Sequence, residues 1–158
     1  MILRDATGAD AAAIADIWNR EIREGVSTFN TVEKELGALK ALIASEAVFK
    51  VAESDGMVLG FATFGPFRSG PGYMRTMEHT IYLAERARGK GLGRVLVDTL
   101  EAEAKARGVH VLVAGVGGEN AGGIAFHKQL GFVEVGRMPQ VGQKFDRWMD
   151  LVLLQKML

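Results

Sequence analysis

The chain has 158 residues, of which 48% are hydrophobic and 24% are charged. This length suits a single domain spanning residues 1–158, and the composition is typical of a folded protein rather than a disordered one. Lysine and arginine together number 19, as do aspartate and glutamate. The chain therefore carries no net charge that would favour binding to nucleic acid or to an anionic membrane.

Residues suited to thiol or metal chemistry are sparse. There is no cysteine, which excludes disulfides, thiolate-bound zinc and a cysteine nucleophile. The three histidines, His79, His110 and His127, are too far apart in the sequence to predict a metal site. No apolar run is long enough for a signal peptide or a membrane span, so we expect a cytoplasmic protein.

The first half of the sequence predicts one strand, two helices and a hairpin. Thr7 and Asp10 have the spacing of a capping box, and Thr31 is placed to cap the second helix. The predicted elements are a strand over 1–4, helices from Thr7 to about Arg23 and after Thr31, and strands over 48–53 and 57–64.

The second half alternates strands with helices. A loop rich in glycine and proline precedes a central strand, and Gly108 stands where a helix-ending glycine is expected. The predicted elements are strands over 74–83, 109–116, 132–136 and 145–154, helices over 89–107 and 120–130, and loops over 65–72 and around Pro139. The order β-α-α-β-β-β-α-β-α-β-β predicts an α/β fold with one mixed sheet.

A glycine cluster separates the central strand from the long helix: Arg88-Gly89-Lys90-Gly91-Leu92-Gly93-Arg94. Backbone N–H groups at a helix N-terminus attract anions, and glycines let an anion approach the backbone closely. A Walker A loop is excluded because Gly91 follows Lys90, and a dinucleotide fingerprint is excluded because Arg94 occupies the sixth position. The remaining alternatives are another phosphate site or a glycine-rich turn with a basic rim.

In this position, Arg88-x-x-Gly91-x-Gly93 resembles the acetyl-CoA pyrophosphate loop of the GNAT N-acetyltransferase superfamily. The element order matches that fold, and Asn120 followed by Gly131-Phe132 resembles its fourth-helix segment. The runs 76–83 and 138–150 are similar to those of the phosphinothricin acetyltransferase group, above all to its methionine sulfoximine and methionine sulfone acetyltransferases.

The resemblance implies acetyl-CoA as a co-substrate, no metal, and a homodimer. It places the pyrophosphate at the loop of Arg88, Gly89, Lys90, Gly91, Leu92, Gly93 and Arg94. The backbone of Ile81, Tyr82 and Leu83 would hold the pantetheine arm, together with Asn120. One backbone N–H of that strand is also suited to polarise the thioester carbonyl.

Glu78 is the candidate general base. Acetyl transfer requires a neutral amine, and an amino acid's amine is mostly protonated at neutral pH, so a base within reach adds rate. A carboxylate on a central strand is partly desolvated, which raises its pKa. The family resemblance points to the same residue. The alternative is a structural ion pair between Glu78 and Arg75 or another cation at the rim of the sheet.

His127 is the candidate acid for the leaving thiolate. Many members of the superfamily have a tyrosine five residues before the phenylalanine of Gly-Phe, and here that position is His127. Protonated imidazole and water are both suitable proton donors, and an ordinary helix residue is the third alternative. Tyr82 faces the same side of the strand as Glu78 if the pairing is regular, but a bulge would reverse that, so Tyr82 is assigned no catalytic role.

Two arginines near the central strand are candidates for binding the carboxylate of the acceptor. Arg68 and Arg75 flank the glycine-proline loop, although the related enzymes carry their arginine one place earlier, where Met74 stands here. Phe29 and Tyr73 are candidates for the walls of an apolar side-chain pocket, with a core role as the alternative.

The leading interpretation is an N-acetyltransferase that acts on a small amino acid or an analogue of one. The alternatives are a transferase for protein N-termini or another amine, and a CoA-binding module without catalysis. Glu78 and the intact glycine loop favour an enzyme.

Overall fold

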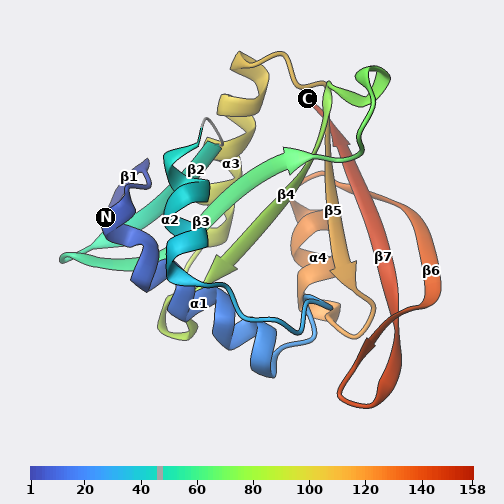
Figure 1. Ribbon diagram of the computed structural model, residues 1–158. Coiled ribbons are helices and arrows are strands. Elements are labelled where there is room, and N and C mark those ends of the chain that lie inside the picture. The colour runs from blue at the N-terminus through green and yellow to red at the C-terminus, as the bar shows by residue number, and fades with distance from the viewer. Residues whose placement is uncertain (46–47) are drawn as a thin grey trace.

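The computed structural model describes residues 1–45 and 48–158, which form one seven-stranded mixed sheet with helices on both faces (Figure 1). The strands are β1 (Ile2–Asp5), β2 (Val48–Ser54), β3 (Met57–Pro66), β4 (Thr76–Leu83), β5 (Val111–Gly117), β6 (Val133–Lys144) and β7 (Arg147–Met157), in the spatial order β1-β2-β3-β4-β5-β7-β6. The α-helices are α1 (Ala11–Glu24), α2 (Leu36–Ala44), α3 (Leu92–Ala106) and α4 (Ala121–Gln129). The predicted α/β fold and element order are confirmed.

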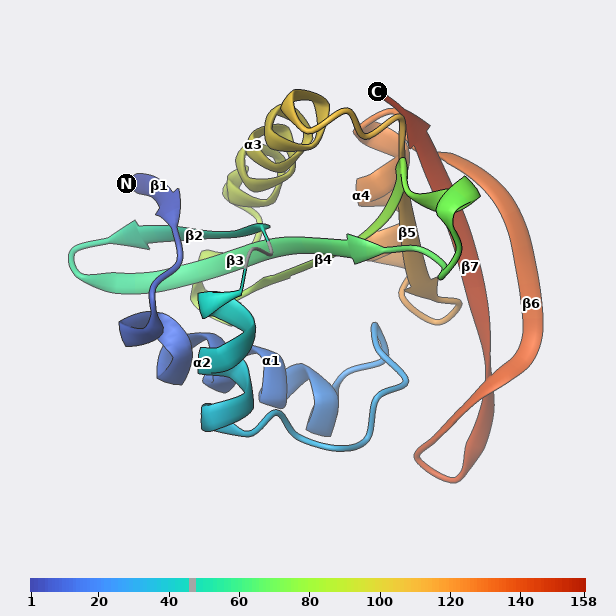
Figure 2. The same cartoon turned by 45° about the horizontal axis from the view of Figure 1, so that its top comes forward.

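Two hydrophobic clusters hold these layers together. On one face, α1 and α2 cover the sheet, and the side chains of Ile14, Trp18 and Ile22 pack with Phe61. These positions of α1 recur every four residues, so they share one side of the helix. On the other face lie α3 and α4, and Leu96 belongs to the cluster there (Figure 2).

The sheet splits between β4 and β5. Parallel pairing joins Thr76–Glu78 only to Val111–Val113, whereas the antiparallel pairing of β3 with β4 continues to Leu83. Past Glu78 the two strands diverge, as Figure 1 shows. One edge of β4 therefore has no strand partner beyond this point among the described residues, and its backbone polar groups are free to bind a ligand.

The beginning of α2 differs from the prediction. The helix starts at Leu36 with Glu35 as its N-cap, so the assignment of Thr31 as the cap was wrong. The physical reason lies in α1: the Asn19 side chain donates to the Lys34 carbonyl at 3.1 Å and accepts from the Lys34 N–H at 2.7 Å. These two bonds hold the segment before Glu35 in a non-helical conformation.

The chain between the last two strands also differs. The predicted loop around Pro139 is part of β6, which continues to Lys144 and pairs with β7. The register is irregular between Met138 and Gly142 on this edge strand, which is where a sheet tolerates proline. Phe145 and Asp146 form the turn with φ of 54° and 57°, so β7 begins two residues later than expected.

Candidate active site

A cavity of about 240 Å³ occupies the split between β4 and β5. We call it the central cavity. Its walls come from both diverging strands, from α4, and from a segment between α1 and α2 that we call the wall loop (residues 25–30). Its lining residues include Glu78, Thr80, Tyr82, Gly115, Gly117, Leu151, Ser27, Thr28, Phe29, Asn120 and His127.

Glu78 lies where the strands separate. A Cβ on Gly115, across the cavity on β5, would come within 3.2 Å of the Glu78 Oε2 atom. The side chain is exposed within the open cavity, yet the surrounding walls desolvate the carboxylate enough to raise its pKa. Among the described residues no cation forms an ion pair with it: Arg75 Nη1 instead donates to the Gly108 carbonyl at 3.0 Å.

A larger groove of about 1280 Å³ meets the central cavity, since Ser27, Ile81, Tyr82 and Asn120 line both. The groove follows the unpaired end of β4 and passes between α1 on one side and the N-termini of α3 and α4 on the other. Unpaired amides at two helix N-termini, together with Arg88, make one wall of this groove favourable for anions.

The predicted glycine loop lies at the start of α3. Gly89 and Gly91 have φ of +74° and +80°, a backbone conformation that favours glycine. Gly91 is the N-cap of α3, and a Cβ on Gly93 would lie 3.0 Å from the ring of Phe126. Glycine at this position therefore lets the two helices approach each other closely.

The loop divides between two surfaces. Arg88, Gly89 and Gly93 line the groove. The remaining residues lie away from it: Lys90, Gly91 and Leu92 line a separate hollow beside Met57, and Arg94 donates to the Gln129 carbonyl at 3.4 Å.

Asn120 begins α4 as expected. Its Oδ1 accepts the Gly123 N–H at 2.9 Å, which satisfies one backbone donor at the helix N-terminus. Asn120 also lines both the groove and the central cavity.

His127 and His79 form a buried pair behind the central cavity. Their Nε2 atoms lie 2.9 Å apart, and His127 Nδ1 lies 2.7 Å from the Gly123 carbonyl. A carbonyl only accepts, so His127 Nδ1 carries the hydrogen, and its Nε2 accepts a hydrogen bond from His79. Burial lowers the pKa of both rings, that of His79 to about 3. His127 is therefore neutral, and both of its nitrogens are engaged within the fold.

Tyr82 lies on the same face of β4 as Glu78, because the β3–β4 register has no shift. Its ring packs near Trp18 and Phe61, with centroids 6.3 Å and 5.9 Å away. Burial raises the pKa of Tyr82 to about 12, so the phenol remains protonated.

The family model for the "Acetyltransferase (GNAT) family" matches residues 12–132 of the chain. The chain belongs to the GNAT acetyltransferase family. Enzymes of this family take their acetyl group from acetyl-CoA, so the protein is an acetyl-CoA-dependent N-acetyltransferase. The groove suits this donor: it offers an unpaired strand edge for an amide-bearing arm and anion-binding helix N-termini for phosphates.

Relatives in the family share most of their length with this chain. The L-amino acid N-acyltransferase MnaT of Escherichia coli is 40% identical over 98% of this chain and 92% of its own. The L-methionine sulfoximine/L-methionine sulfone acetyltransferase of Salmonella typhimurium is 41% identical over 98% and 93%. The phosphinothricin N-acetyltransferase of Alcaligenes faecalis is 36% identical over 93% and 77%.

Solved structures agree with this GNAT fold. An acetyltransferase of Salmonella typhimurium, solved with its cofactor acetyl-CoA, superposes with a TM-score of 0.96 at 39% identity, covering 100% of this chain and 94% of its own. A structure titled ribosomal-protein-alanine N-acetyltransferase, from Brucella melitensis, has a TM-score of 0.94 at 40% identity and covers 100% of both chains.

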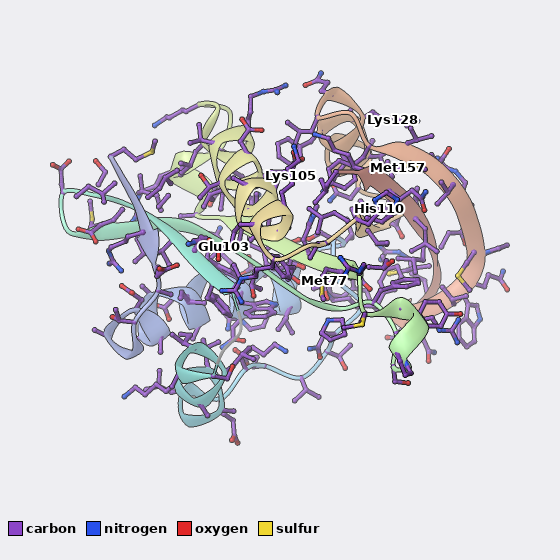
Figure 3. The ribbon with its side chains drawn as sticks, turned by 90° about the horizontal axis from the view of Figure 1, so that it is seen from above. Met77, Glu103, Lys105, His110, Lys128 and Met157 are labelled. Carbon is purple, nitrogen blue, oxygen red and sulfur yellow. The ribbon has the colours of Figure 1, made fainter. Side chains whose placement is uncertain are left out.

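On the acceptor side, this GNAT chain brings together only part of the predicted set. Phe29 and Glu78 line the central cavity, whereas Arg68, Tyr73 and Arg75 do not. Arg68 lies over the Tyr73 ring, 5.7 Å from its centroid. Arg75 immediately precedes β4, and its carbonyl accepts the N–H of His110, the residue before β5, at 2.8 Å. Figure 3 labels His110 together with Met77 of β4.

Four residues that line the central cavity were not predicted from the sequence: Ser27, Thr28, Gly115 and Gly117. A signal for the glycines existed: Gly115, Gly117 and Gly118 crowd the end of a buried strand, and glycine in a strand often marks a close approach. A Cβ on Gly117 would lie 2.0 Å from the Val26 carbonyl oxygen. The wall loop therefore rests directly against the end of β5.

No helix among the described residues is both long enough and apolar enough to cross a membrane.

Proposed function

We propose that the enzyme acetylates the α-amine of a small amino acid or analogue, of the methionine sulfoximine, methionine sulfone or phosphinothricin type. The acetyl group passes directly from acetyl-CoA to the amine, with Glu78 as the general base. The names of the relatives support this acceptor class. The position of Glu78, in a small cavity that meets the groove, carries the proposal.

Glu78 removes the proton that the attacking amine must lose. Burial raises its pKa, which makes the ionised carboxylate a stronger base than that of an exposed glutamate. The central cavity is open around the carboxylate, so a water molecule has room to relay the proton.

The backbone of β4 holds the donor and polarises its carbonyl. Past Glu78 the strand has no partner on its β5 edge among the described residues, which leaves N–H groups free to stabilise negative charge on the thioester oxygen. Arg88, Gly89 and Gly93 attract the phosphates at the far end of the groove.

Water protonates the leaving thiolate in this proposal. The engaged nitrogens and lowered pKa of His127 leave the ring no proton to offer at neutral pH. A thiolate is also a fair leaving group without assistance. His127 instead supports the cavity wall through its bonds to His79 and to the Gly123 carbonyl.

The size of the central cavity favours a small acceptor. About 240 Å³, walled by Phe29 and Leu151, suits an amino acid side chain better than an extended peptide. No arginine or lysine is among the described residues that line it. A carboxylate contact from Arg68 or Arg75 therefore requires the acceptor's carboxylate to project from the cavity mouth.

We also propose that the enzyme is a cytoplasmic homodimer. The edge strand β6 and its turn expose large apolar side chains, as expected of a surface that a second copy covers. These residues are Val133, Val135, Met138, Val141 and Phe145. Light scattering after size exclusion should give twice the 17.1 kDa chain mass.

Thiol release from acetyl-CoA across a panel of amines tests the acceptor class. The proposal expects turnover with methionine sulfoximine, methionine sulfone or phosphinothricin and none with polyamines. The name of the Brucella melitensis protein favours a second candidate, acetylation of a protein N-terminal alanine. Turnover only with alanine-initiated peptides would establish that candidate and overturn the first, and binding of CoA without turnover would favour a non-catalytic module.

A further inference from the structure

Lys144, the last residue of β6, is a buried lysine, with only 4% of its surface exposed. Its ammonium donates to three backbone carbonyls, those of Gly25 at 2.6 Å, Thr28 at 3.0 Å and Glu21 at 3.3 Å. An ammonium has three N–H donors, so all of them are used. Among the described residues no carboxylate forms an ion pair with it at 4.0 Å or less, and burial lowers its pKa.

The three carbonyls join the end of α1 to the wall loop. Glu21 lies in the last turn of α1, and Gly25 is the residue that ends the helix. Helix C-termini leave carbonyls without helical partners and carry partial negative charge, which a cation stabilises. Thr28, by contrast, lines the central cavity. One ammonium therefore holds the wall loop against the helix from which it emerges.

The same hairpin also supports the next residue of the wall loop. A Cβ on Gly142 would lie 2.4 Å from the Phe29 ring, so the ring rests directly on the β6 backbone. On the opposite strand, Arg147 pairs with Glu119 at 2.7 Å, next to the α4 cap Asn120. The β6–β7 hairpin thus contacts two of the segments that line the central cavity.

We infer that Lys144 is a positioning residue that sets acceptor affinity by fixing the wall loop through its three carbonyl contacts. This inference rests on the proposed function, in which the central cavity holds the acceptor. Lysine suits the position because three carbonyls converge on one compact ammonium, whereas the planar guanidinium of arginine spreads its donors. The groove is also lined by α1 and by residues 25–27 of the wall loop, but Lys144 forms no hydrogen bond with its anion-binding residues Arg88, Gly89 and Gly93. Acetyl-CoA binding should therefore depend less on this contact than acceptor binding does.

Lys144→Met tests the inference, because it keeps an apolar stem of similar length and removes the three donors. The acceptor KM should rise about tenfold or more, as expected when charge-assisted hydrogen bonds are lost. The KM for acetyl-CoA should change less than about twofold, and Lys144→Arg should not restore the acceptor KM.

Lys156→Met is the matched control. Lys156 is partly buried, and its Nζ pairs with Glu101 at 2.8 Å, away from the residues that line the cavity. This variant should lose stability without a change in acceptor KM. An unchanged acceptor KM in Lys144→Met, or an equal loss in both lysine variants, would overturn the inference.

A chemical rescue isolates the ammonium itself. The chain has no cysteine, so Lys144→Cys introduces a single thiol that 2-bromoethylamine converts, in denaturant before refolding, into a lysine analogue. The aminoethylated protein should regain the acceptor KM, and a bromoethane-treated sample should not. Equal acceptor KM values for the two products would overturn the inference.

Hydrogen exchange separates this inference from the proposed function. Exchange over residues 25–30 should be faster in Lys144→Met than in wild type, and unchanged in Lys156→Met. If exchange is faster in Lys144→Met but the wild-type protein acetylates no amino acid, the inference about Lys144 stands and the proposed function is refuted. Unchanged exchange over residues 25–30 in Lys144→Met would refute the inference about Lys144. If Lys144→Met does not fold, Lys144→Gln replaces it in the exchange experiment. Its shorter side chain has two N–H donors for the three carbonyls, so exchange over residues 25–30 should again be faster than in wild type.

Discussion

The carboxylate of Glu78 and the α-carbon of Gly115 face each other across the split between β4 and β5. A methyl group on Gly115 would come within 3.2 Å of Glu78 Oε2 and 3.6 Å of a Leu151 methyl. The absence of a side chain on β5 therefore creates the space in which the carboxylate lies. This relationship places the candidate base where β4 and β5 separate, which is where the acceptor amine and the acetyl group meet in the proposed function.

Gly115→Ala should displace the Glu78 carboxylate. Because small misplacements of a catalytic group are costly, we expect kcat to fall by about tenfold to a hundredfold. The CoA dissociation constant should be unchanged, since Gly115 does not line the groove. Steady-state kinetics and calorimetry measure the two effects. A normal kcat in a folded Gly115→Ala enzyme would contradict the placement of Glu78.

Gly91→Val should weaken acetyl-CoA binding through the backbone. A Cβ at Gly91 meets nothing within 4 Å, but φ is +80°, where a β-branched residue is strained by roughly 1–2 kcal/mol. Relief of that strain would reshape the start of α3 and its anion-binding amides. Calorimetry should show CoA affinity reduced by about tenfold, an effect equivalent to roughly 1.4 kcal/mol. Gly136→Ala, with open space and no positive φ, is the control, and equal affinities would contradict the prediction.

The buried histidine pair should make the fold sensitive to acid. The pKa of His79 is about 3 in the folded chain against 6.5 in the unfolded chain. Between these values the unfolded state binds more protons, so stability is full above pH 6.5 and is lost as pH falls toward 3. This one residue should cost about 2 kcal/mol between pH 7 and pH 5.

His79→Gln removes this titration while keeping an N–H donor toward His127. Urea unfolding at pH 7 and pH 5 should show a smaller loss of the free energy of unfolding in the variant than in wild type. An identical loss in both proteins would show that His79 does not titrate on unfolding.

Acceptors that lack a carboxylate should be poor substrates. Amidated or decarboxylated analogues should lose turnover by about tenfold or more, as expected for a lost charge-assisted pair of about 1.5–3 kcal/mol. Arg75 is already bonded to the Gly108 carbonyl, so Arg68→Gln should reduce the preference for the acid more than Arg75→Gln. Equal turnover of acid and amide would indicate a different class of amine.

The element order could be predicted because local pattern decides it. Ile14, Trp18 and Ile22 share one side of α1, and the loop from Arg88 to Arg94 lies between β4 and α3 as expected. The resemblance then supplied the family and the donor, which the comparisons confirm. Glu78 also lies in the cavity as its strand position implied.

The acceptor side could not be predicted, because distant segments build it. Lys144 reaches the Gly25 carbonyl across 119 positions of sequence, and no local pattern reports such a contact. Asn19 likewise delays the start of α2 by bonding Lys34. The tautomer of His79 depends on a tertiary contact with His127, 48 positions away. The spacing of residues in the sequence predicts none of these contacts.

The most direct test of the central claim is the acetylation rate of Glu78→Gln at pH 7, measured with the preferred amine at saturating acetyl-CoA. The variant keeps the shape and hydrogen bonding of Glu78 but lacks a basic oxygen. A positioned base contributes about 10²–10⁴-fold, so kcat should fall within that range and recover partly as pH rises and free amine accumulates. CoA affinity and the melting temperature should stay near those of wild type. A folded Glu78→Gln enzyme with near-normal kcat at pH 7 would contradict the assignment of Glu78 as the general base.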